Sequence, residues 1–176
     1  MTEVAVHFAV PFALTAPVLG LRRALLLSLI ALIPDLDALL QIHRSATHSV
    51  ITLLAITAVA VFLVRRLRPN LFGSACASGL ALLSHPVMDL FSTYTPILYP
   101  LMRDSVWLKV EGFVLIGQSI KPHLTTVVAT EPTAFQRFQV LDAPVFTSEG
   151  FILSLLLVAV PLLMVLRQQV RRVKPS

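Results

Sequence analysis

Seven ionisable side chains lie inside long apolar runs of this sequence or within a few residues of them. They are His7, Asp35, Asp37, His43, His48, His85 and Asp89. Titratable groups are costly in apolar segments, so they mark candidate functional sites there. Imidazole and carboxylate groups together are ligands for zinc, manganese or iron, and a single cysteine, Cys76, excludes a cysteine-based zinc finger. The residue types therefore indicate a metal site.

The spacing of these residues suits a shared cation. His85 and Asp89 are four residues apart and would project from one face of a helix. Asp35 and Asp37 lie so close together in an apolar setting that they call for a cation, either a metal ion or Arg44. A set of histidines and carboxylates with an open coordination position can activate water as a nucleophile. The Arg44 guanidinium can bind a phosphate or a carboxylate through two hydrogen bonds.

Five apolar runs must position these side chains, and each is roughly long enough to cross a bilayer. Hydrophobic residues make up 56% of the 176 residues and charged residues 13%, which argues against an ordinary soluble domain and against disorder. We therefore predict an all-α membrane protein with a single domain over residues 1–176, built as a bundle of about five transmembrane helices. The predicted helices cover residues 4–21, 24–42, 47–64, 71–91 and 151–166.

The segment between the fourth and fifth runs, residues 92–150, is predicted to form an outer-side cap over the bundle. It carries charges along its length, together with Tyr99 and Trp107, which suit a membrane interface. Residues 106–114 alternate loosely, and residues 124–129 are rich in β-branched side chains. Short strands and interfacial helices are therefore both open for this segment.

The basic residues set the expected orientation. If five helices alternate, nine of the fourteen basic residues and no acidic residue fall on one side. These nine are Arg22, Arg23, Arg65, Arg66, Arg68, Arg167, Arg171, Arg172 and Lys174. We therefore expect a multi-pass protein of the cytoplasmic (inner) membrane, with its N-terminus outside and its C-terminus in the cytoplasm. Basic clusters that face anionic lipid account for the net charge of +5 without a nucleic-acid partner.

Under this topology the seven ionisable residues all lie at one depth, in or near the outer half of the membrane. Unrelated residues would be scattered along the helices. Taken alone, a histidine such as His7 near a helix end is as often an interhelical hydrogen bond or a cap as a ligand. For the seven together, helix packing is a weaker explanation than a shared site. Thr47 and Ser49 are expected to cap the third helix.

Several short motifs occur in an order that resembles a known family. They are His7 in the first helix, Pro34–Asp37, His43–Ser49, Ser84–Asp89 and Leu98–Pro100. Together they resemble the YdjM-like family, which is described as predicted membrane-bound metal-dependent hydrolases. The resemblance covers about the first hundred residues. The sequence departs from the family where Tyr94 is followed by Thr95 instead of the usual glycine, which affects the expected turn but not the candidate ligands.

The resemblance implies hydrolysis of an ester, and a distant similarity of the family to zinc-dependent phospholipases C implies a phosphoester. We expect the substrate to be a membrane lipid or a small membrane-adjacent ester, and the cofactor to be a divalent metal ion. Zinc is favoured, with manganese and iron as alternatives. The expected metal ligands are His7, Asp35, Asp37, His48, His85 and Asp89. The expected catalytic residues are Asp37, His43 and Arg44, and Arg44 also binds substrate.

Two non-enzymatic alternatives use the same residues. A metal or ion carrier would hold its cargo in the same cluster of histidines and aspartates, and a structural membrane protein would use the cluster as a buried polar network. A carrier needs polar groups through the whole membrane thickness. The third and fifth runs carry almost none, which favours an enzyme. The number of metal ions and the oligomeric state stay open.

Overall fold

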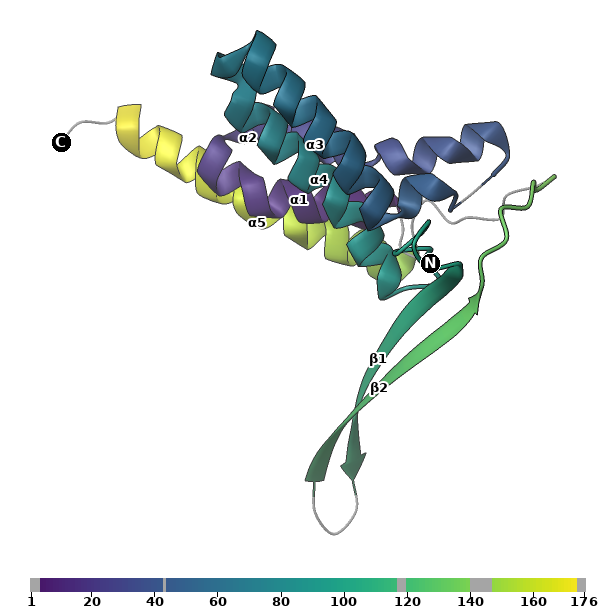
Figure 1. Cartoon of the computed structure of the whole chain (residues 1–176). Helices are drawn as coiled ribbons and strands as arrows, with labels where there is room; N and C mark the ends of the chain where they lie inside the picture. The colour runs from purple at the N-terminus through teal and green to yellow at the C-terminus, as the bar shows by residue number, and fades with distance from the viewer. Residues whose placement is uncertain (1–3, 43, 117–119, 140–146, 174–176) are drawn as a thin grey trace.

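The computed structural model describes residues 4–42, 44–116, 120–139 and 147–173, with the backbone alone over residues 168–173. Within these ranges the chain forms five α-helices, three short 3-10 helices and two strands (Figure 1). The α-helices are α1 (Val4–Leu19), α2 (Leu21–Ala31), α3 (Val50–Leu67), α4 (Phe72–Leu90) and α5 (Ser148–Val173). The 3-10 helices are η1 (Ile33–Leu40), η2 (Ala46–His48) and η3 (Pro69–Leu71), and the strands are β1 (Asp104–Ile116) and β2 (Ile120–Pro132).

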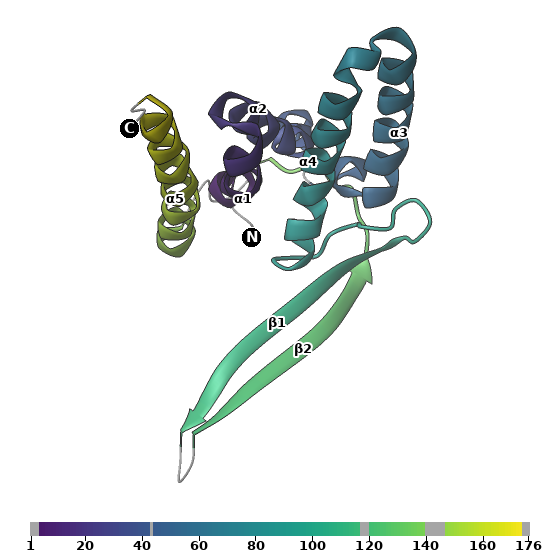
Figure 2. The same ribbon diagram turned by 90° about the vertical axis from the view of Figure 1, so that its left-hand side faces the viewer.

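The helices pack side by side in a bundle. Figure 2 shows α5 on one flank, α1 and α2 in the middle, and α4 and α3 on the other flank. The chain reverses between α1 and α2 at a single residue, Gly20, whose φ of +82° is a conformation that favours glycine. At one end of the bundle lie Arg22, Arg23 and the η3 turn, and we call this the basic end. At the opposite end lie η1, η2 and the root of the strands.

Small side chains let the helices approach closely. Phe12 and Ala16 of α1 form a buried cluster with Ala24 of α2. Where α4 meets α3, a side chain at Gly79 would collide with the methyl group of Thr57. Helix association in lipid depends on such close contacts, because lipid tails remove the usual hydrophobic driving force. The packing therefore places α1, α2 and α4 near enough for polar groups from all three to meet.

The expectation of five transmembrane helices is wrong for the part of the chain that the structure describes. Three helical segments are long and apolar enough to span a membrane: Val50–Leu67, Pro69–Leu90 and Ser148–Arg167. The first apolar run forms a helix of only 16 residues, Val4–Leu19. The α-helix of the second run has 11 residues, which at about 1.5 Å per residue reach only about half of a hydrocarbon core.

The second run is broken where its polar residues begin. The predicted helix over 24–42 ends at Ala31 and continues as the 3-10 helix η1. Pro34 lies at the start of η1, and it has no N–H to donate to an α-helical hydrogen bond. Gln41 ends the segment with a φ of +59°. As a result, Asp35 and Asp37 lie on a separate segment beyond the helix.

The all-α prediction is also wrong, because β1 and β2 form an antiparallel hairpin. Instead of capping the bundle, the hairpin reaches away from it (Figures 1 and 2). Thr95, which replaces the usual glycine, is fully buried and exchanges two backbone hydrogen bonds of 2.9 Å with Val106. This pair fixes the start of β1 close to the end of α4. The return chain passes the end of η1, where Ile42 pairs with Arg137.

Candidate metal centre

Helix α4 supplies the centre of the site. His85 and Asp89 lie one turn apart on its buried side, with exposed fractions of 0% and 3%. His7 of α1 meets them: its Nε2 lies 3.2 Å from Asp89 Oδ1, and its ring stacks on that of His85 with centroids 3.9 Å apart. The contact between α1 and α4 therefore brings together residues 82 positions apart in the chain.

The 3-10 segments η1 and η2 complete the cluster. Asp35 Oδ1 lies 3.2 Å from His85 Nε2 and 3.4 Å from His48 Nε2. The two Nε2 atoms lie 3.2 Å from each other, and Asp89 Oδ2 lies 3.5 Å from both. Each of these four ligand atoms, which come from three elements, thus lies within 3.5 Å of at least two of the others. We call Asp35, His48, His85 and Asp89, with His7 beside them, the His/Asp cluster.

These distances fit a bound transition metal. Two neighbouring ligands about 2.0–2.2 Å from a tetrahedral ion lie roughly 3.3–3.6 Å apart. The distances that join His48 Nε2 and His85 Nε2 to each other and to the oxygens of Asp35 and Asp89 run from 3.2 to 3.5 Å. Two groups of three residues each bring their ligand atoms within 4.8 Å of one another: Asp35, His48 and His85, and His7, His85 and Asp89. The donor set of imidazole and carboxylate suits zinc, iron or manganese.

Hydrogen bonds on the far sides of the rings orient the two central histidines. His85 Nδ1 lies 2.8 Å from the carbonyl oxygen of Ala31, to which it can only donate. This bond leaves the lone pair of His85 on Nε2, which faces the cluster. His48 Nδ1 lies 3.3 Å from Asp37 Oδ2. A carboxylate behind a metal-binding histidine fixes the ring and raises its basicity as a ligand.

Asp37 therefore lies behind His48, and neither group of candidate ligands includes it among the described residues. Its Oδ2 accepts hydrogen bonds of 2.8 Å from the Ser45 backbone N–H and from the Thr47 hydroxyl. Two further expectations concern this loop. Ser49 is confirmed as the N-cap of α3, accepting a bond from the Thr52 N–H, whereas Thr47 holds Asp37. The sequence patterns did not predict that the Ser45 N–H binds Asp37 or that the Ala31 carbonyl orients His85.

Arg44 lies in the loop between η1 and η2. Its φ of +57° is unusual for a residue with a side chain, and such backbone conformations gather at functional sites. Its Nε is buried and has no hydrogen-bond partner among the residues that the structure describes. The loop that leads into η2, which carries His48, thus holds a guanidinium nitrogen whose hydrogen bond is unused among the described residues. His43, the neighbouring candidate catalytic residue, lies outside the described residues.

Asp35 and His48, both outside the candidate spans, shift each other's pKa in opposite directions. Burial disfavours the charged form of Asp35, but hydrogen bonds from His48 and His85 outweigh it and hold the pKa of this carboxyl below its usual range. Burial disfavours protonated His48, but bonds to Asp35 and Asp37 outweigh it and raise the pKa of this imidazole. The carboxylates thus attract positive charge to the cluster, which a divalent ion can supply.

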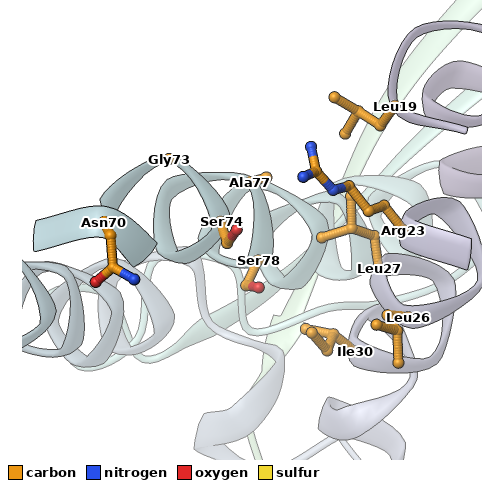
Figure 3. A pocket seen from close by; sticks show the side chains of 10 residues that line it. All are labelled: Leu19, Arg23, Leu26, Leu27, Ile30, Asn70, Gly73, Ser74, Ala77 and Ser78. Atoms are coloured by element: carbon orange, nitrogen blue, oxygen red, sulfur yellow. The ribbon is translucent and has the colours of Figure 1, made fainter. Parts of the chain in front are cut away.

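A separate cavity of about 480 Å³ opens between α2 and α4 toward the basic end. Figure 3 shows Arg23 and Leu27 on one wall and Ala77 and Ser78 on the other. No residue of the His/Asp cluster lines it. Its lining offers one cation and several hydroxyl or apolar groups, but no acid and base side by side. Although this cavity is large, its lining does not make it a candidate catalytic site.

Comparison with known proteins identifies a family. A family model described as YdjM inner membrane protein matches residues 1–171. No curated protein and no solved structure is significantly similar to the chain. The match extends well beyond the hundred residues that carry the sequence motifs, and it includes the hairpin and α5.

Proposed function

Since the chain belongs to the YdjM inner membrane protein family, we propose that it is a membrane-embedded hydrolase that uses a metal ion to cleave an ester, most simply a phosphoester of a lipid or of a membrane-adjacent molecule. The observation that carries this proposal is that His48 Nε2 and His85 Nε2 lie 3.2 Å apart, and that each lies 3.2–3.5 Å from Asp35 Oδ1 and Asp89 Oδ2. We assign the ion to these four atoms and prefer zinc.

The remaining residues of the site support the ligands. We assign Asp37 a positioning role, because it contacts the Nδ1 side of His48. This differs from the ligand and catalytic roles expected from the sequence. His7 contacts Asp89 Oδ1 and stacks on the ring of His85. It therefore holds the Asp89 carboxylate so that its other oxygen, Oδ2, faces the proposed ion. The Ala31 carbonyl does the same for His85.

A bound divalent ion would act as a Lewis acid and lower the pKa of a coordinated water. Substrate would reach it from the side of Asp35, whose side chain is 23% exposed while those of His48, His85 and Asp89 are at most 4% exposed. The second oxygen of Asp35 would accept a proton from the water as the water oxygen forms its bond to the phosphorus or carbon of the ester, and would return that proton to the leaving alcohol oxygen as its bond breaks. The guanidinium of Arg44 would stabilise negative charge that develops on the ester group.

The distribution of polar groups supports an enzyme over an ion carrier. Among the described residues, the two groups that could hold a metal lie at one end of the bundle. Toward the basic end, the cavity between α2 and α4 offers Arg23, which would repel a cation. Since basic residues are retained in the cytoplasm, we propose that the basic end faces the cytoplasm and that substrate is cleaved on the outer side.

The experiment uses the full chain purified in detergent. Metal content is measured by mass spectrometry, and hydrolysis of a panel of phospholipids and soluble phosphoesters is measured with added zinc or manganese. Asp89→Asn should lower both, while His123→Ala, in the exposed hairpin, should change neither. Stoichiometric metal without hydrolysis of any ester would support a carrier, and a parent protein without stoichiometric metal would reduce the cluster to a polar network.

A further inference from the structure

The two faces of the hairpin differ in charge: one carries charged side chains among apolar ones, such as Phe113 and Leu115, and the other carries almost none. Because β1 and β2 pair in continuous register, paired residues share a face and alternate residues face opposite sides. One face carries no charge beyond its root, and we call it the uncharged face. Its residues are Val106, Leu108, Val110, Gly112, Val114, Ile116, Ile120, Pro122, Leu124, Thr126, Val128 and Thr130. The charged and titratable residues of β1 and β2 beyond Asp104 lie on the other face: Lys109, Glu111, Lys121, His123 and Glu131.

The uncharged face is open over most of its length. Val110, Val114, Ile116, Leu124 and Val128 are 48%, 55%, 81%, 71% and 64% exposed. A two-stranded hairpin is at best marginally stable in water, and it needs a further layer to cover an apolar face. A contiguous apolar surface of this kind marks a contact with another apolar phase. The hairpin therefore requires a covering that the described residues of this chain do not supply.

The root of the hairpin lies where a membrane span ends. Trp107 packs edge-on against Tyr94, with ring centroids 5.5 Å apart, and its Nε1 donates to the carbonyl of Phe91, just beyond α4. Lys109 lies over the Trp107 ring. Tryptophan and tyrosine beside a lysine are typical of the membrane–water interface. This places the start of β1 at the level of the lipid head groups.

The direction of the hairpin keeps it near that level. Figures 1 and 2 both show β1 and β2 leaving the end of the bundle at an angle to the helices and extending toward the side on which α5 lies. Strands of 13 residues at about 3.3 Å per residue extend roughly 40 Å beyond the root. A hairpin that leaves a span at the interface and is inclined to it stays closer to the membrane surface than one that continues along the span.

We propose that the hairpin lies flat on the membrane surface, with its uncharged face against the lipid and its charged face toward water. The open edges of β1 and β2 carry unpaired N–H and C=O groups, which must stay hydrated and therefore hold the hairpin at head-group depth instead of deeper. The surface that covers the uncharged face is then the same bilayer that the helices span. This inference does not depend on the metal or on catalysis.

Neighbouring residues on opposite faces provide the test. Single cysteines are placed at Val127 and Val128 and at His123 and Leu124, in a Cys76→Ala background, and each is labelled with a polarity-sensitive fluorophore. The protein is reconstituted in nanodiscs of phosphatidylcholine and phosphatidylglycerol. Quenching is measured with a lipid that carries a nitroxide near its head group, and with aqueous iodide. Val127 and Val128 are a matched pair, because they differ in face but not in residue type.

We expect the labels at Val128→Cys and Leu124→Cys to be quenched several-fold more by the nitroxide lipid than those at Val127→Cys and His123→Cys, and several-fold less by iodide. Equal quenching by iodide on both faces would overturn the proposal. So would efficient disulfide crosslinking of Val128→Cys between two copies, because it would assign the uncharged face to a second chain. Elution of all four variants as single species, with the helical circular dichroism of the Cys76→Ala parent, would show that the bundle is intact.

Discussion

Ionisable side chains are buried at one end of the bundle and exposed at the other. At one end, His7, His85 and Asp89 are buried and bonded to one another. At the basic end, Arg22 and Arg23 are exposed. Exposed arginines keep their hydration, but buried ionisable groups lose it and are tolerated only where they are well paired.

Stability alone does not explain why ionisable groups are buried together at one end of the bundle. Replacing a buried polar cluster with apolar residues is often neutral or stabilising. A bundle that needed only to fold would therefore not require Asp35, His48, His85 and Asp89 to meet. The cavity toward the basic end differs from the His/Asp cluster, because it is open and its lining has no histidine or carboxylate. The cavity between α2 and α4 and the buried His/Asp cluster thus lie toward different ends of the bundle.

The strongest test of the contrast removes one shared ligand. His85 belongs to both groups of candidate ligands, so His85→Ala should abolish stoichiometric metal and reduce hydrolysis to background. The missing ring should leave a cavity without unfolding the bundle. Metal analysis and ester hydrolysis measure the outcome, with His123→Ala as the histidine control. Retention of full metal content in His85→Ala would break the assignment.

Arg44 separates charge stabilisation from metal binding. Arg44→Gln should keep the metal, because a guanidinium cannot ligate a cation, but should lower kcat about 10²–10³-fold, as expected for loss of a donor to a developing anion. Arg103→Gln, an exposed arginine near the root of the hairpin, is the matched control. An unchanged kcat in Arg44→Gln would remove Arg44 from the mechanism.

Asp37 tests whether the second layer of the site matters. Asp37→Asn keeps the shape of the side chain but weakens its bond to His48 Nδ1, so metal affinity should fall about 10–100-fold while the fold is kept. Competition with a fluorescent chelator measures the affinity. Asp104→Asn, at the start of β1, serves as control. If Asp37→Asn lost the metal as completely as His85→Ala, Asp37 would be a ligand itself.

Metal affinity should depend on pH through His48. In the metal-free protein, burial favours the neutral ring, but the bonds to Asp35 and Asp37 outweigh it and raise the pKa above 6.5. Protons therefore compete with metal below this raised pKa, and affinity should fall by about tenfold per pH unit for each proton displaced. Asp37→Asn should move this transition to lower pH. Affinity that stays constant from pH 8 to pH 5 would contradict a histidine-held ion.

The smallest effect is expected at the basic end. A side chain at Gly73 meets no atom within 4 Å, so Gly73→Leu should fill part of the cavity without straining α4. Metal content and turnover should both equal those of the parent. A large loss of turnover with normal metal would mean that substrate occupies this cavity, and the contrast between the two ends would need revision.

Much of the site follows from the sequence. A histidine and a carboxylate four residues apart, and polar residues at one depth, predict that side chains from several helices meet. The structure brings together five of the six expected ligands, His7, Asp35, His48, His85 and Asp89, and sets the sixth, Asp37, one bond further out. Which side of a ring a carboxylate contacts depends on tertiary packing, so no spacing rule could assign Asp37.

The fold was harder to predict for physical reasons. The apolar runs predict a turn between residues 21 and 24, and Pro34 predicts a kink. They do not reveal that the chain already reverses at Gly20, or that the α-helix of the second run ends at Ala31. The hairpin was hidden because loose alternation occurs both in strands and in interfacial helices. Its register depends on pairing between segments that only the folded chain brings together.

The most direct test is X-ray absorption spectroscopy of the purified full chain, with metal stoichiometry determined on the same sample. The account predicts about one zinc, manganese or iron ion per chain, with scattering from two imidazole rings and from carboxylate oxygens at bond lengths of about 2.0–2.2 Å. In a His48→Ala, His85→Ala double variant the ion should be lost. A chain without stoichiometric metal, or an ion with no imidazole in its shell, would contradict the account.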